Sequence, residues 1–88
     1  MKVEFRDSFA KDLKCIRDKS VLRRAKEIIA TIEKADSPAH IPNLKKLKGY
    51  ANYYRLRAGD YRVGLALHHD TVIFVRILDR KDIYKYFP

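Results

Sequence analysis

A two-residue turn between two alternating segments constrains the fold of this chain more than any other feature. Gly59-Asp60 separates residues 53–58 from residues 61–67, and both segments alternate between apolar residues and basic or small ones. Glycine at the first turn position favours a tight β-hairpin because it tolerates a positive φ. The sequence therefore predicts two antiparallel strands in a fixed register, with Arg57 opposite Arg62.

The register divides the hairpin side chains between two faces, because residues directly opposite each other point to the same side of a sheet. The face expected to join the core carries Tyr54, Leu56, Val63, Leu65 and Leu67. The other face is expected to carry Tyr53, Arg55, Arg57 and Arg62, beside an open floor of Gly64 and Ala66. Two hypotheses fit these neighbouring arginines: they bind an anion, or they splay apart into water.

The remaining segments predict a single α+β domain over residues 1–88. Residues 2–6 alternate as a short strand, and residues 71–78 form an apolar run typical of an interior strand. Apolar residues at helical spacing predict two helices, the second capped by Ser20: Phe9, Leu13 and Ile16, then Val21, Ala25, Ile28, Ile29 and Ile32. The expected order is an N-terminal strand, an antiparallel two-helix hairpin and a three-stranded antiparallel meander, with the helices on one face of the sheet.

Charge is the most unusual aspect of the composition, with a net value of +9 for 88 residues. Residues 44–88 contain ten basic and four acidic residues, which indicates a polyanionic partner. The single cysteine, Cys15, excludes an internal disulfide and favours a cytoplasmic setting, and we expect it to be buried. No apolar stretch approaches the ~20 residues of a membrane span. Metal-ligand spacings and Gly-rich phosphate loops are absent, so neither a metal nor a cofactor is expected.

The hairpin and the segment after it resemble a known family. The sequence L-K-G-Y-A-N-Y-Y-R-L-R-A-G-D-Y-R-V-G, followed by the apolar strand and D-R-K-D-I-Y, looks like the RelE/ParE superfamily of type II toxin–antitoxin systems. The similarity covers essentially the whole chain and implies the RelE-like microbial RNase fold. RelE-like toxins cut messenger RNA in the ribosomal A site, whereas ParE-like toxins poison DNA gyrase without nuclease chemistry. We favour the RelE-like branch.

The resemblance implies a catalytic role for five residues. Arg62 matches the arginine that supports the cleaved phosphate, and Arg80 matches a basic residue that binds phosphate near the leaving group. Tyr84 matches a C-terminal tyrosine that stacks on or orients the nucleotide. Arg55 and Arg57 fall where RelE-like nucleases have two basic residues, one of which is thought to transfer a proton. Arginine fills that role poorly because it hardly deprotonates.

A second group of residues is expected to bind RNA without taking part in the chemistry, mainly through its phosphates. These residues are Lys45, Lys46, Lys48, Lys81 and Tyr53. Asp79 stands where many relatives have a histidine. An acid at this position would repel RNA unless it pairs with Arg80 or Lys81.

The RelE-like reading implies a ribosome-dependent endoribonuclease that aligns the RNA 2′-hydroxyl with the adjacent phosphorus and stabilises the charge that develops there. Its partners would be the ribosome and messenger RNA. Two alternatives remain: a ParE-like gyrase inhibitor, or a degenerate toxin that only binds its antitoxin. All three imply a cognate antitoxin, acidic where it covers this chain, and contact with operator DNA only through that antitoxin.

Overall fold

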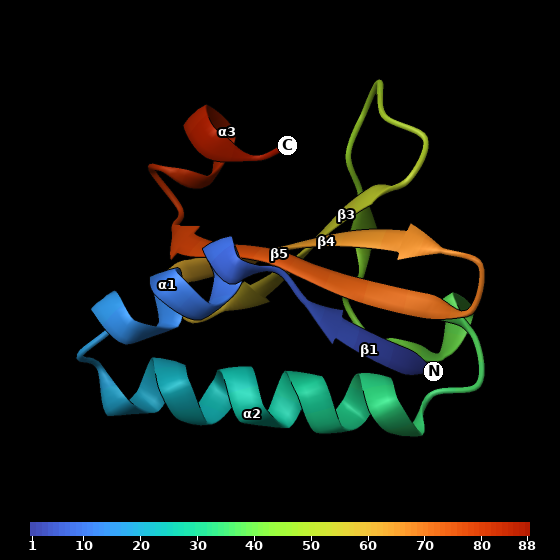
Figure 1. The fold of residues 1–88 in the computed structure, drawn as a ribbon, viewed down its shortest axis with the longest axis horizontal. Helices are drawn as coiled ribbons and strands as arrows, with labels where there is room; N and C mark the ends of the chain where they lie inside the picture. Colours follow the sequence, from blue (N-terminus) through green and yellow to red (C-terminus); the bar gives the residue numbers. More distant parts are fainter.

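Five strands form one sheet in the order β1-β5-β4-β3-β2 in the computed structural model, which describes residues 1–88 (Figure 1). The strands are β1 (Lys2–Phe5), β2 (Lys45–Lys46), β3 (Tyr53–Ala58), β4 (Tyr61–His68) and β5 (Thr71–Asp79). β1 runs parallel to β5, and every other neighbouring pair is antiparallel. The predicted meander of β3, β4 and β5 is confirmed. The short strand β2, which was not expected, pairs with the first half of β3.

Two helices precede the meander and a short one follows it. They are α1 (Asp7–Cys15), α2 (Lys19–Lys34) and α3 (Ile83–Tyr86), with a 3₁₀ turn, η1 (Pro38–His40), before β2. α2 runs along one side of the sheet and α3 lies on the other side (Figure 1). The expected cap of α2 is wrong by two residues: Asp18 is the N-cap, and its carboxylate accepts hydrogen bonds from the hydroxyl and backbone N–H of Ser20. These bonds lower the pKa of Asp18.

The core lies between the two long helices and the sheet. Its most deeply buried side chains include Phe9, Ile32, Val63, Leu65, Phe74 and Ile77. The predicted apolar face of the hairpin is confirmed, because Leu56, Val63 and Leu65 are buried and Tyr54 and Leu67 pack against the core. Cys15, which we expected to be buried, is exposed at the last position of α1.

α1 completes the edge of β5 beyond the end of β1. β1 pairs only with the first part of β5, and Val75 is skipped in the pairing between β4 and β5. The Ser8 hydroxyl donates to the carbonyl of Val75 at 2.6 Å, and the Asp12 carboxylate accepts from the backbone N–H of Ile77 at 3.0 Å. Side chains of α1 thus replace the missing strand and satisfy exposed edge groups.

Asp12 also forms the protein's salt bridge, with Arg76 of β5. Arg76 donates from Nε and Nη2 to the two carboxylate oxygens at 2.8 and 2.9 Å. This paired, charge-assisted geometry raises the pKa of Arg76. The pair fixes α1 against β5 at the end of the strand that leads to Arg80.

Replacing Asp12 with alanine should lower the free energy of unfolding by about 2–3 kcal/mol, because it leaves a half-buried guanidinium and a backbone N–H without their acceptor. Urea denaturation followed by circular dichroism measures the change. The exposed Asp7 at the start of the same helix is the matched control, since its carboxylate makes no such contacts. Equal losses for Asp7→Ala and Asp12→Ala would contradict the assigned role.

Candidate functional site

The turn between β3 and β4 holds two arginines against a single carbonyl. Gly59 has a φ of +65°, and Arg57 lies opposite Arg62 as the sequence predicted. Arg57 Nε donates to the carbonyl oxygen of Gly59 at 3.3 Å, and Arg62 Nη1 donates to the same oxygen at 3.2 Å. Arg62 Nη1 also donates to the carbonyl of Tyr61 at 3.1 Å. The backbone of the turn therefore sets the position of both guanidinium groups.

Positive charge accumulates around Arg62. Its pKa is lowered, first by burial and then by the charges of Arg57, Arg55 and Arg80, with a weaker opposing effect from Asp60. An arginine still stays protonated in proteins. The protein therefore maintains a cation where neighbouring cations oppose it, and a bound anion would relieve this repulsion.

Arg55, Arg57 and Arg62 line a groove of about 570 Å³ that has no hydrophobic lining residue. It is lined by Arg24, Asn43, Lys45, Arg55, Arg57, Gly59 and Arg62. The groove unites four residues singled out in the sequence: Lys45, Arg55, Arg57 and Arg62. Arg24 of α2 and Asn43 of the loop before β2 were missed. Arg24 lies among mixed charges typical of a solvated helix face, so no local sequence signal distinguishes it.

Arg80 and Tyr84 approach the groove from the C-terminal segment. The backbone N–H of Arg80 donates to the carbonyl of Asp60 at 2.9 Å, which places the end of β5 beside the hairpin turn. Tyr84 lies on α3 and is 60% exposed, and the guanidinium carbon of Arg55 lies 5.4 Å from the centre of its ring. Arg80 thus lies beside the hairpin turn, and the accessible ring of Tyr84 lies beside Arg55, which lines the groove.

Asp79 forms no salt bridge with Arg80 or Lys81, the pairing that would keep it from repelling RNA. The Asp79 carboxylate instead accepts a hydrogen bond from the backbone N–H of Lys81 at 2.9 Å, which stabilises the turn after β5. Lys81 itself is exposed and does not line the groove.

A second hollow adjoins the groove at Arg55, which lines both. Its other lining residues include Lys46, Lys48 and Tyr84, together with Phe87 near the end of the chain. The three neighbouring lysines that were expected to bind RNA therefore lie at two sites. Lys45 lines the groove, whereas Lys46 and Lys48 line the hollow.

The expectation of an open floor beside the arginines is wrong at Gly64. The ring of Phe87, which is only 4% exposed, covers it: a Cβ atom on Gly64 would lie 2.7–2.8 Å from three ring carbons. The Tyr53 ring packs edge-on against Phe87 at 5.5 Å between centroids and against Tyr50 at 5.9 Å. Tyr53 is thus half-buried in an aromatic row, and its predicted contact with RNA would have to use the remaining exposed part.

Comparison with known proteins places this architecture in a family. The sequence model of the ParE toxins of type II toxin–antitoxin systems matches residues 3–84. Toxin RelE3 of Methanocaldococcus jannaschii is 46% identical, over the whole of both chains. No helix of the structure is long and apolar enough to span a bilayer.

Solved structures agree with the sequence comparison. A toxin chain in the RelB–RelE antitoxin–toxin complex from Methanococcus jannaschii has a TM-score of 0.81 at 44% identity, covering 97% of this chain and 99% of that one. The archaeal RelE–RelB complex from Pyrococcus horikoshii OT3 contains a chain with a TM-score of 0.71 at 25% identity, covering 90% and 93%. With the family model, these matches show that the chain belongs to the ParE toxin family, within the RelE/ParE superfamily of type II toxin–antitoxin systems.

Proposed function

We propose that this toxin is a cytoplasmic, ribosome-dependent endoribonuclease that cleaves messenger RNA within the A site. The observation that carries the proposal is the pair of arginines tied to one turn carbonyl in a groove without hydrophobic residues. Arginine's forked donors match the non-bridging oxygens of a phosphodiester. The similarity to toxin RelE3 favours this activity over gyrase binding.

In the proposed reaction the RNA supplies its own nucleophile. The 2′-oxygen attacks the adjacent phosphorus and its proton passes to water, the bond from phosphorus to the 5′-oxygen breaks, and water protonates the leaving 5′-oxygen. The products carry a 2′,3′-cyclic phosphate and a 5′-hydroxyl. Arg62 and Arg57 stabilise the charge on the non-bridging oxygens, and Arg80 lies near the leaving oxygen. Tyr84 stacks on the nucleotide. Arginines do not act as proton acceptors at neutral pH, so the site contributes alignment and charge stabilisation rather than a general base.

The solved archaeal relatives are bound to RelB antitoxins. For this chain we propose an antitoxin of its own, with an acidic segment that lies on the arginine groove and excludes RNA. Contact with operator DNA would occur only through that antitoxin.

The test is a cleavage assay with purified protein and ribosomes paused on a defined message. We expect the message to be cut within the A-site codon, with a 2′,3′-cyclic phosphate on the upstream product. Message without ribosomes, which should stay intact, is the control. Intact message on programmed ribosomes would overturn the proposal.

The match to the ParE family model favours a second candidate, inhibition of DNA gyrase. A supercoiling assay with the same preparation distinguishes the two activities, because the proposed nuclease should leave gyrase unaffected. Normal growth of cells that express the toxin without antitoxin would instead indicate a degenerate toxin.

A further inference from the structure

We propose that Arg24 of α2 binds a second RNA phosphate, adjacent to the one held by Arg57 and Arg62. This inference rests on the proposed function and extends its site: it adds a helix residue to a groove otherwise built from the sheet and its loops. It also assigns a path to the RNA chain, from the outer face of the hairpin over the edge of β3 towards α2.

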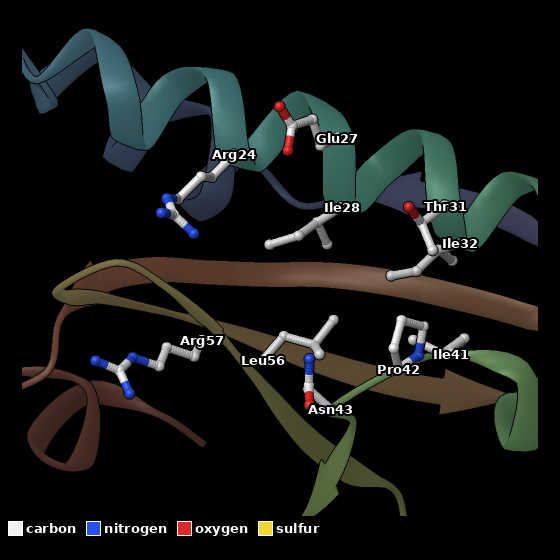
Figure 2. A pocket seen from close by; sticks show the side chains of 10 residues that line it. All are labelled: Arg24, Glu27, Ile28, Thr31, Ile32, Ile41, Pro42, Asn43, Leu56 and Arg57. Carbon is white, nitrogen blue, oxygen red and sulfur yellow. The ribbon is translucent and has the colours of Figure 1, made fainter.

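The position of Arg24 carries the first step. A Cβ atom built on Gly59 would lie 4.0 Å from Cδ of Arg24, so the stem of this side chain passes beside the turn that holds Arg57 and Arg62. Figure 2 shows Arg24 and Arg57 at the same end of a cleft between α2 and β3. Glu27 also lines this cleft but forms no salt bridge with either arginine. Arg24 and Arg57 line both this cleft and the groove, so the two adjoin each other.

The second step concerns free hydrogen-bond donors. Arg57 and Arg62 each use donors on backbone carbonyls of the turn. The salt bridge of the protein joins Arg76 to Asp12, and no hydrogen bond engages the side chain of Arg24. Its guanidinium therefore retains all five N–H donors and a charge that no carboxylate neutralises. A phosphate group would accept hydrogen bonds from these donors and neutralise this charge.

The third step is the open edge of β3. β2 pairs with β3 only at Tyr54 and Arg55, so no strand continues beyond Arg55 on that side of the hairpin. A chain whose reacting phosphate lies on Arg57 and Arg62 can cross this edge and place its next phosphate at Arg24. We infer a phosphate rather than a base because the guanidinium fork matches two phosphate oxygens.

Binding of short oligonucleotides of different length tests the inference. We would measure fluorescence anisotropy with labelled 2′-O-methyl RNA, which lacks the nucleophile, comparing a dinucleotide that has a single internal phosphate with a tetranucleotide. Arg24→Ala should weaken tetranucleotide binding roughly tenfold and leave dinucleotide binding unchanged, because a charge-assisted hydrogen bond is lost only with the longer ligand. The slope of log K against log salt should fall by about 0.7 for the tetranucleotide, as expected for one phosphate contact on a single strand.

Arg23→Ala is the matched control, because Arg23 is an exposed arginine next in sequence that does not line the groove. Equal effects of Arg23→Ala and Arg24→Ala would mean that each variant weakens binding only by removing one positive charge, and would overturn the inference. So would equal losses for the two ligand lengths, or a loss confined to an acidic antitoxin peptide. Cleavage on ribosomes gives a second readout: Arg24→Ala should raise KM with kcat nearly unchanged, and an unchanged KM would also overturn it.

These outcomes are separable from failure of the proposed function. If the wild-type protein does not cut message but Arg24→Ala still weakens only the longer oligonucleotide, the second phosphate site stands and the nuclease assignment falls. If the wild-type protein cuts message and Arg24→Ala changes neither binding nor KM, the nuclease assignment stands and the second phosphate site falls.

Discussion

Arg62→Ala should reduce ribosome-dependent cleavage by about 10²–10³-fold, the loss typical of removing one donor that stabilises developing charge in a transition state. Arg62 is half-buried, and its guanidinium is held on the carbonyls of Gly59 and Tyr61. The group is therefore positioned before RNA binds and does not need to be ordered during the reaction. Single-turnover cleavage of a message on programmed ribosomes measures the effect.

Arg62→Lys separates the contribution of the two guanidinium donors from that of the positive charge. Lysine keeps the positive charge but cannot both donate to the Gly59 carbonyl and present a planar pair of donors to the phosphate. We expect it to recover only a small part of the activity. Circular dichroism should show both variants folded, because neither substitution touches the core. If cells expressing Arg62→Ala stop growing as wild-type cells do, gyrase or another target replaces messenger RNA.

The sequence predicted the parts of the site that depend on local rules. A two-residue turn fixes which residues of a hairpin are opposite each other, so the pairing of Arg57 with Arg62 followed directly from Gly59-Asp60. The two helices were also predicted from a local rule, because their apolar residues recur at helical spacing. The division of the hairpin into a core face and a basic face needed no knowledge of the rest of the chain.

Contacts between distant segments were not predictable in this way. Arg24 enters the groove only because α2 packs beside the hairpin, and its surroundings in the sequence look like an ordinary solvated helix surface. The hydroxyl of Ser8 donates to the carbonyl of Val75 on β5, a contact that depends on where β1 ends and on the skipped position in β5. Gly64 suggested an open floor above the sheet, but the sequence did not reveal that the ring of Phe87 fills that space.

The close fit of Phe87 on Gly64 leads to a prediction about how the C-terminal segment is held. Gly64→Ala would place a methyl group 2.7–2.8 Å from three ring carbons, which real contacts do not allow, so the ring must move or leave. We expect the free energy of unfolding to fall by about 2 kcal/mol, as for other overpacked sites. Phe87→Ala should lower it by about 3 kcal/mol, because a nearly fully buried ring is lost.

The double variant Gly64→Ala/Phe87→Ala should be no less stable than Phe87→Ala alone, because the added methyl then has no ring to strike. Such non-additivity is the signature of two groups in direct contact. Urea denaturation of the wild type, both single variants and the double variant measures it. Tyr86→Ala is the control for shortening an aromatic residue of the same segment, since Tyr86 is 59% exposed and should cost far less.

The same variants should also affect cleavage, because the Phe87 ring anchors the helix that carries Tyr84 near Arg55. Each single variant should lose roughly tenfold in cleavage rate, the energy of one base–aromatic stacking contact. The double variant should lose no more than either, since the segment is already released. Additive losses in stability and activity would mean that Phe87 and Gly64 act independently, and that α3 is held against the sheet by Ile83 rather than by the ring.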